Sequence, residues 1–321
     1  MVARGELRDD TLGSRRISPV RPERSVLRQA QDDRRFDGFM RDSDPPRCSG
    51  RTDIDLVCAS LVIHRIDSLL DLSAFEALLA EPGPWVGAFD LPFGLPRELV
   101  NVLGWPTTWR ELVLHTHDIG KDAFKDALNR VRESRPMGAR YIPRRGDVLA
   151  GASSPMKLVN PPVGLMFFEG APRIARSGVS VVPCASTADS RVALEGYPGF
   201  LARHFIKTSY KKDGPEGRSG ARTRNREIIV NGLSVGSSFT QGLGVEIPEL
   251  LRLLCIEDGS GDALDAVLCA VQAAMALRVC HMGDARYGIP NSADPFEGWI
   301  ATVPDFTFAV IKKADSAEII R

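Results

Sequence analysis

A short apolar segment in the first third of the chain, PWVGAF (residues 84–89), ends directly in Asp90 and the turn LPFGLP. An apolar run this short, bounded by turn residues, is typical of a buried strand. A carboxylate is costly to bury unless it is paired or holds a metal. Ligands usually bind at the carboxyl ends of strands in α/β sheets. The segment therefore predicts a buried sheet with a candidate ligand site at its strand ends.

Other strand and helix patterns follow along the chain. Strands are predicted at 54–63, 84–89, 178–183, 191–199 and 298–304, and helices at 73–80, 97–134, 162–178, 248–256 and 262–279. Ser73 and Glu76 have the spacing of a capping box at the start of the first helix. The first strands lie too close together for helical crossovers, so the order favours a mixed α/β sheet over a parallel, doubly wound one.

The N-terminal residues 1–35 differ in composition from the rest of the chain. They are rich in arginine and aspartate and show neither helical nor strand periodicity. This composition predicts a solvated tail, and a mis-assigned start codon is an equal alternative. The segment lacks the continuous apolar core of a signal peptide, so a cytoplasmic location is expected.

Overall composition excludes some classes of protein. The chain has 321 residues, 43% of them hydrophobic and 26% charged, which is ordinary for a globular protein. No apolar run approaches the roughly 20 residues of a membrane span, so no membrane contact is expected. The net charge is zero, so the protein as a whole does not attract nucleic acid. Its six cysteines show neither a C-x-x-C pair nor zinc spacing and are interpreted as reduced thiols.

Four carboxylates stand where a metal site would be built. Asp90 and Glu195 each close a strand candidate, and Asp262 and Asp265 lie three apart on one face at the start of a long helix. Magnesium is usually held by one or two carboxylates with water and substrate phosphate. Convergence of these acids would form a two-metal site for phosphoryl transfer.

Each of these acids also has a purely structural interpretation. Asp262 and Asp265 are favoured in the first turn of a helix by its dipole. Asp90 could cap the turn that follows it. Glu195 could pair with an arginine. These alternatives remain open at this stage.

A basic stretch, residues 207–226, is the best candidate for phosphate contacts. Its cationic residues are Lys207, Lys211, Lys212, Arg218, Arg222, Arg224 and Arg226. Tyr210 lies among them and is available to stack on a base. The alternative is a solvated basic loop. RYIPRR, residues 140–145, is a second and weaker candidate.

Four long motifs resemble domain-of-unknown-function family 429. They read GAFDLPFGLPRELV, SPMKLVNPPVGLMFFEGAPRIARSGV, VALEGYPGFLARHFI and SGDALDAVLCAVQAA, and the similarity runs from Leu72 to Ala276. The family is regarded as predicted ribonuclease H-like nucleases. The resemblance implies a five-stranded mixed sheet flanked by helices over residues 36–321, with a helical insertion at 97–178.

The resemblance also implies a set of metal ligands. Asp90 matches the acid of the D-x-P-x-G-L-P motif, Glu195 the acid of E-x-Y-P, and Asp265 the acid within D-A-L-D-A. Asp262 is a fourth candidate ligand. The implied cofactor is Mg²⁺ or Mn²⁺, and the implied reaction is hydrolysis of phosphodiester bonds in DNA or RNA.

The chain departs from the family pattern at its first strand. Met40, in GFMRDSDPP, stands where the family has an aspartate, and Asp42 lies two residues later. This departure favours an alternative function, a catalytically inactive nucleic-acid-binding protein that keeps the fold. A third possibility is the related fold of sugar kinases and actin-like ATPases. It ranks last because the chain lacks glycine-rich phosphate loops.

Overall fold

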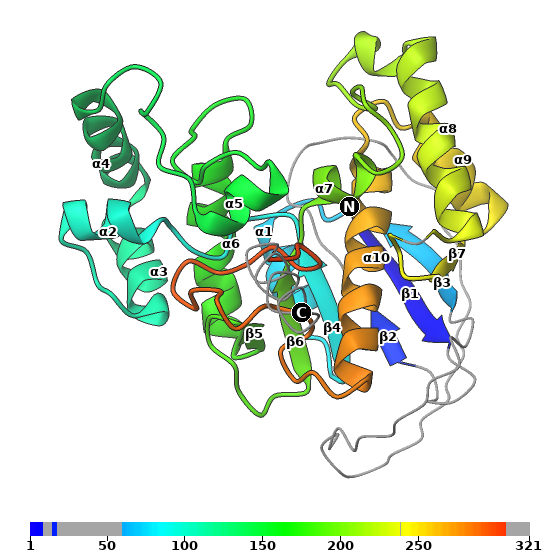
Figure 1. The fold of residues 1–321 in the computed structure, drawn as a ribbon, viewed down its shortest axis with the longest axis horizontal. Coiled ribbons are helices and arrows are strands. Elements are labelled where there is room, and N and C mark those ends of the chain that lie inside the picture. Colours follow the sequence, from blue (N-terminus) through cyan, green and yellow to red (C-terminus); the bar gives the residue numbers. More distant parts are fainter. Residues whose placement is uncertain (9–14, 18–59, 238, 306–321) are drawn as a thin grey trace, which may run out of the picture.

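The computed structural model describes residues 1–8, 15–17, 60–237 and 239–305. In this part of the chain, helices cover a mixed sheet of seven strands in the order β5-β6-β4-β2-β1-β3-β7 (Figure 1). The predicted α/β class is confirmed. The five-stranded sheet expected from the family resemblance is not found, because strands that the sequence did not indicate extend it.

The strands come from widely separated parts of the chain. They are β1 (Val2–Arg8), β2 (Arg15–Ile17), β3 (Ser60–Asp67), β4 (Trp85–Phe89), β5 (Ser180–Val182), β6 (Arg191–Glu195) and β7 (Gly244–Glu246). β1 runs antiparallel to β2 and β3, and all other neighbouring strands are parallel. The sheet is therefore mixed, as the spacing of the first strands predicts.

The first strand corrects the expectation of a solvated tail for part of residues 1–35. β1 is an inner strand, and its Val2, Ala3 and Leu7 are buried. The charged residues of β1 hide its strand pattern in the sequence, yet Arg4 is satisfied by ion pairs with Asp67 and with Glu81. Met40 and Asp42, which bear on the family's first strand, lie outside the described residues.

Most predicted helices are present. The insertion contains α2 (Arg97–Leu103), α3 (Trp109–Asp118), α4 (Lys121–Ser134), α5 (Arg145–Ala150) and α6 (Val163–Ser177). The other helices are α1 (Leu72–Leu79), α7 (Pro198–Ala202), the short 3-10 helix η1 (Pro215–Arg218), α8 (Gly220–Val235), α9 (Glu249–Glu257) and α10 (Asp262–His281).

Two of the local predictions are wrong. The side chain that caps α1 belongs to Asp71, which accepts from the backbone amide of Ala74, so the predicted capping box at Ser73 is not formed. The segment 298–304 was expected to be a strand. It makes only a single bridge, between Ile300 and Glu195, among the described residues.

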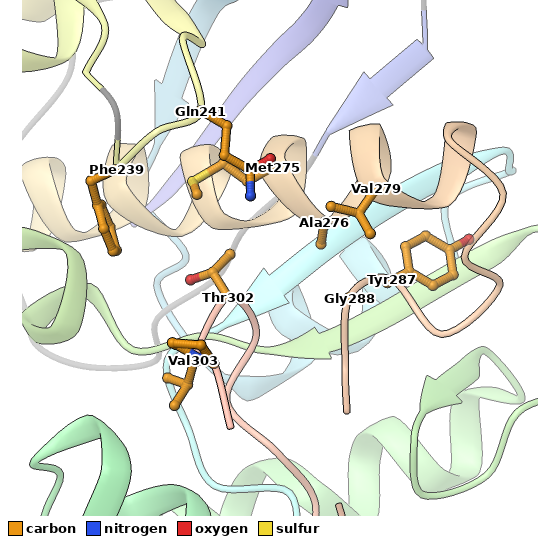
Figure 2. Close-up of a pocket in the computed structure, with 10 residues that line it drawn as sticks. Phe239, Gln241, Met275, Ala276, Val279, Tyr287, Gly288, Thr302 and Val303 are labelled. Carbon is orange, nitrogen blue, oxygen red and sulfur yellow. The ribbon is translucent and has the colours of Figure 1, made fainter. Parts of the chain in front are cut away.

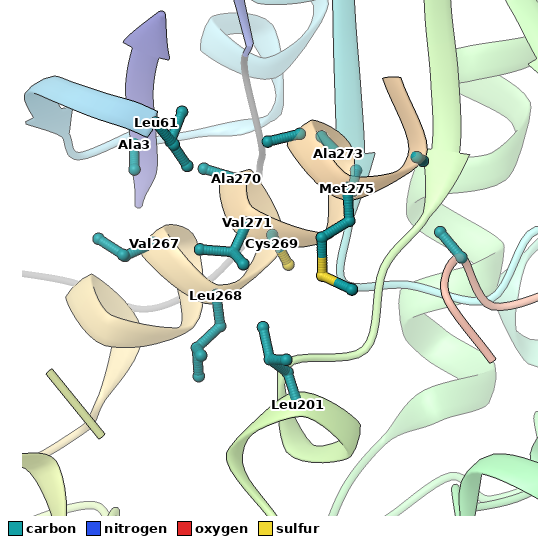
Figure 3. Close-up of a cluster of buried hydrophobic side chains, with 14 of the residues drawn as sticks. Ala3, Leu61, Leu201, Val267, Leu268, Cys269, Ala270, Val271, Ala273 and Met275 are labelled. Atoms are coloured by element: carbon teal, nitrogen blue, oxygen red, sulfur yellow. The ribbon is translucent and has the colours of Figure 1, made fainter. Parts of the chain in front are cut away.

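Helix α10 lies against the sheet and carries the larger core cluster, here called the α10 core (Figure 3). Its members include Ala3, Leu61, Leu201, Val267 and Leu268. α10 is long and apolar enough to cross a membrane by length and composition, but most of it is buried inside the protein. No apolar run near the length of a membrane span was expected from the sequence, whereas α10 reaches that length. Buried core helices of soluble proteins have the same length and composition.

A second cluster, here called the insertion core, lies on the opposite side of the sheet. It joins Phe75 and Phe89 to Trp109, Phe124 and Phe167 of the insertion. Successive residues of β4 divide between the clusters, because Ala88 belongs to the α10 core and Phe89 to the insertion core. This alternation decides where the residues at the strand ends point.

Candidate functional site

Asp90 is buried, with 8% of its surface exposed, in a tight turn after β4. The backbone amide of Leu91 donates to the carbonyl of Phe89 at 2.8 Å, so Asp90 is the central residue of a three-residue turn. A side chain at Gly94 would come within 2.4 Å of the carbonyl oxygen of Phe296. The glycine of the motif is therefore needed for close packing of this turn on the C-terminal segment.

Glu195, at the end of β6, is bound by an arginine of the insertion. The Nη2 and Nη1 atoms of Arg144 donate to its two carboxylate oxygens at 2.5 Å and 2.8 Å. Arg144 also donates to Asp147 at 2.6 Å, and the amide of Phe93 donates to Glu195 at 2.9 Å. All three charged side chains are buried. Here they are called the Arg144 triad.

The charges in the Arg144 triad do not balance, because two carboxylates share one guanidinium. Burial raises the pKa of Glu195 above its usual range, and the attraction of Arg144 offsets this only in part. Burial alone would lower the pKa of Arg144, but Asp147 and Glu195 together raise it well above the ordinary value. Arg144 therefore stays charged and holds the insertion to the end of β6.

Asp265 is fully buried in the first turn of α10 and is also neutralised. The hydroxyl of Tyr210 donates to one of its oxygens at 2.5 Å, and Lys211 forms an ion pair with the other. Asp262, three residues earlier in the same turn, is partly exposed. The predicted role of Tyr210 in base stacking is wrong, because its side chain is buried and bound to Asp265.

Strand register separates Glu195 from the acids of α10. Phe89 and Glu195 are direct partners in the parallel pair β4–β6. Phe89 points into the insertion core, and Glu195 points to the same side, where it meets Arg144. The preceding residue of β6, Leu194, belongs to the α10 core. The carboxylate of Glu195 thus faces away from the helix that carries Asp265.

The predicted ligands are not gathered into a metal-binding group in the described residues. No group of three histidine, cysteine, aspartate or glutamate side chains suited to a metal ion occurs in the described ranges. Both oxygens of Glu195 and both of Asp265 already accept from donors on cationic or phenolic groups. Mg²⁺ and Mn²⁺ require such oxygens as ligands. Of the predicted set, the structure therefore supports no joint site for Asp90, Glu195 and Asp265.

The predicted phosphate-binding residues fall into two groups. Lys212 pairs with Glu216, and Arg222 donates to the backbone of Glu216 and to Ser219. In contrast, Lys207, Arg218 and Arg224 are exposed and form no ion pair within the described ranges. These three cations remain available to an external anion.

Arg226 organises this region from inside. It is fully buried and donates to the carbonyls of Ile256, Tyr210 and Gly217 at 2.6, 2.7 and 2.9 Å. A side chain at Gly217 would come within 2.1 Å of the Lys212 carbonyl oxygen, so the loop closes tightly on itself. Arg226 is thus a structural residue, and the loop before α8 has a fixed conformation that presents its exposed cations.

Aromatic and basic side chains on and beside α7 lie next to these cations. The guanidinium of Arg203 lies 5.2 Å from the ring centroid of Tyr197, a cation–π distance. His204 stacks on Phe239 and meets Phe200 edge-on at 5.3 Å between ring centroids. Burial lowers the pKa of His204, so its imidazole is neutral near pH 7. A neutral aromatic surface therefore adjoins the exposed Lys207.

Arg144 has a role other than the one predicted from the sequence, and Asp147 was not singled out there. Arg144 belongs to RYIPRR, which was considered a second phosphate-binding candidate; its burial and its bonds to Glu195 exclude that role. The alternative that Glu195 pairs with an arginine is the arrangement found. Sequence spacing could not identify Arg144 as the partner of Glu195, because the two residues are 51 positions apart in the chain.

Comparisons with protein-family models, with curated proteins and with solved structures found no match to this chain. The resemblance to domain-of-unknown-function family 429 therefore stays a prediction.

Proposed function

We propose that this protein binds nucleic acid without metal-dependent hydrolysis, through a basic segment that spans residues 203–226. The observation that carries the proposal is the local excess of positive charge in this segment of a chain whose net charge is zero. This segment contains eight basic and two acidic residues, whereas the whole chain has 41 of each. Lys207, Arg218 and Arg224 stand exposed on it without an ion pair in the described ranges. Unpaired cations release counterions from a phosphate backbone when they bind, which favours association.

The aromatic side chains beside the basic segment support nucleic acid over other polyanions. Bases of single-stranded nucleic acid stack on aromatic rings while lysines and arginines follow the backbone. Tyr197, Phe200, His204 and Phe239 form such a partly exposed group next to Lys207. Binding of a polyanion that has no bases would not require this aromatic group.

The proposal leaves out hydrolysis because the carboxylates of Glu195 and Asp265 are already bound by other side chains. A metal-dependent nuclease needs carboxylate oxygens free to coordinate Mg²⁺ or Mn²⁺. Here Arg144 holds Glu195, and Lys211 and Tyr210 hold Asp265. A nuclease reading would require both cations to withdraw from buried partners. The alternative of a non-catalytic binder, which the Met40 departure also favours, is therefore preferred.

The ribonuclease H-like class is part of the same proposal. It is supported by the parallel pair β4–β6, by Asp90 directly after β4 and Glu195 at the end of β6, and by helices on both faces of a mixed sheet. The seven-stranded order departs from the expected five. In this reading the chain keeps the acids of a nuclease as structural anchors.

The proposal is tested by binding of a fluorescein-labelled single-stranded DNA oligonucleotide at increasing KCl concentration. Lys207→Gln and Arg224→Gln are each expected to weaken binding and to lower the slope of log K against log salt by about 0.7. Arg130→Gln is the matched control, because Arg130 is an exposed arginine on α4, at the opposite end of the molecule from α8 (Figure 1). No binding by the wild type, or equal effects of all three variants, would contradict the proposal.

A further inference from the structure

A pocket of about 310 Å³ lies between α10 and the segment that ends the described chain. Figure 2 shows Phe239 at one end, Tyr287 at the other, and Met275, Ala276 and Val279 of α10 along one side. Its volume is at the lower limit of typical ligand sites. None of its lining residues is charged. Such a space suits a single neutral ring system rather than a phosphate or a carboxylate, which would lose its hydration without compensation.

Backbone strain is concentrated at this pocket. Gln241, Tyr287 and Thr302, which all line it, have φ values of 55°, 58° and 68°. The described residues contain one other non-glycine residue with positive φ, Asn160. The left-handed region is unfavourable for these side chains, and strain of this kind clusters at ligand-binding sites.

Two polar residues of α10 bind two of the three strained positions, Thr302 and Gln241. The amide of the buried Gln272 donates to the carbonyl of Ala301 at 3.0 Å and to the hydroxyl of Thr302 at 3.2 Å. The guanidinium of Arg278 donates to the carbonyl of Gln241 at 3.0 Å. The pocket is therefore a built feature, with its rims tied to the helix that forms its wall.

The rim of the pocket is cationic, although its interior is neutral. Arg278 is partly exposed and forms no ion pair with any residue in the described ranges. The ring of Phe239, which lines the pocket, stacks on His204, three residues before Lys207. A ligand that fills the pocket with a ring can thus place an anionic group against Arg278 and continue toward the basic segment.

We infer that the pocket binds a nucleobase and that Arg278 contacts the phosphate attached to it. This inference deepens the proposed function and rests on it, because the base is expected to come from a strand bound along residues 203–226. Phe239 and Tyr287 supply the aromatic contacts, and Gln241 and Thr302 supply hydrogen-bonding groups at the edge. A free mononucleotide has the same chemistry and is the other source of the ligand.

Two variants, Val279→Phe and Arg278→Gln, test the inference by separate routes. Val279→Phe places a larger side chain into the pocket from a partly exposed position. Its control is Val102→Phe, the same change at a position 61% exposed on α2. Val279→Phe is expected to weaken binding of the labelled oligonucleotide about tenfold, or 1.4 kcal/mol, within the range of one stacked base. Val102→Phe is expected to leave it unchanged.

Arg278→Gln removes the positive charge and leaves a shorter, neutral amide side chain at the same position. It is expected to weaken AMP and the oligonucleotide several-fold while leaving uncharged adenosine unaffected. This contrast holds even if Val279→Phe disturbs folding, which circular dichroism would reveal. A merely structural role of Arg278 would change AMP and adenosine alike and would overturn the assignment of the phosphate contact.

The outcomes separate the inference from the proposed function. If the oligonucleotide binds the wild type and both pocket variants equally, the pocket assignment is wrong and the basic segment alone explains binding. If AMP binds and the variants weaken it while the oligonucleotide does not bind, the pocket assignment holds with a mononucleotide as ligand, and the proposed function fails. If neither AMP nor the oligonucleotide binds, both are wrong.

Discussion

Arg144 binds both carboxylate oxygens of Glu195, at 2.5 Å and 2.8 Å, across 51 residues of sequence. The arginine stands just before the insertion helix α5, and the glutamate ends the central strand β6. Paired and parallel contacts of this kind are the strongest form of ion pair. The acid that sequence motifs suggest as a metal ligand is here an anchor between two parts of the fold.

Replacement of Arg144 by methionine is expected to destabilise the protein by about 3–5 kcal/mol, the usual cost of leaving buried charge without its partner. Glu195 and Asp147 would both remain in a site with little access to water. Urea unfolding measures the change. Arg140→Met is the control, because Arg140 is exposed and pairs with no described acid. A loss below 1 kcal/mol for Arg144→Met would contradict the anchor role.

Tyr210→Phe is expected to cost about 1–3 kcal/mol, because it leaves an oxygen of the fully buried Asp265 without the hydroxyl donor. Tyr141→Phe removes a hydroxyl at a position 40% exposed and is expected to change stability little. Thermal or urea unfolding of the two variants gives the comparison. Equal effects would mean that the Tyr210 hydroxyl is not a significant partner of Asp265.

Arg226→Met is expected to loosen the loop before α8, since the carbonyls of Tyr210 and Gly217 would lose their buried donor. Amide hydrogen exchange in residues 210–218 should then become faster, and oligonucleotide binding should weaken with it. Arg224→Met, at an exposed position on the same helix, should leave exchange in this loop unchanged. Unchanged exchange in Arg226→Met would show that the loop is held by other contacts.

His204 makes the stability depend on pH. Burial lowers its pKa in the folded protein, so the unfolded chain binds a proton at a higher pH than the folded one. Stability is therefore complete above the ordinary histidine pKa and falls as the pH drops through the folded value. The difference in unfolding free energy between the wild type and His204→Gln is expected to shrink from pH 8 to pH 5. A difference that does not vary with pH would exclude this contribution.

Much of the fold follows from local patterns in the sequence. The runs around Phe89 and Leu194 are short, apolar and bounded by turns, and both form strands as predicted; their parallel pairing is shown by the structure. α6 ends where Gly178 adopts φ 77°, the left-handed cap that its position after a helical pattern indicates. β1 was missed because Arg4 and Glu6 interrupt its apolar residues, and their partners lie elsewhere in the chain.

The candidate site was harder to predict, because it depends on register and on distant partners. The acids were correctly located at strand ends and at a helix start. A sequence cannot show that Glu195 points to the insertion side of the sheet, since this depends on its pairing with Phe89. Nor does spacing reveal that Lys211 is bound to Asp265 while Lys207, four residues before it, is exposed.

The most direct test of the account is the metal dependence of oligonucleotide binding and cleavage. The labelled single-stranded oligonucleotide is incubated with the wild type and with Asp90→Asn, in Mn²⁺ and in EDTA, and both affinity and strand length are measured. We expect salt-sensitive binding in EDTA, equal affinity for both proteins, and an intact strand in Mn²⁺. Cleavage that requires Mn²⁺ and disappears in Asp90→Asn would contradict it and would restore the acids as metal ligands.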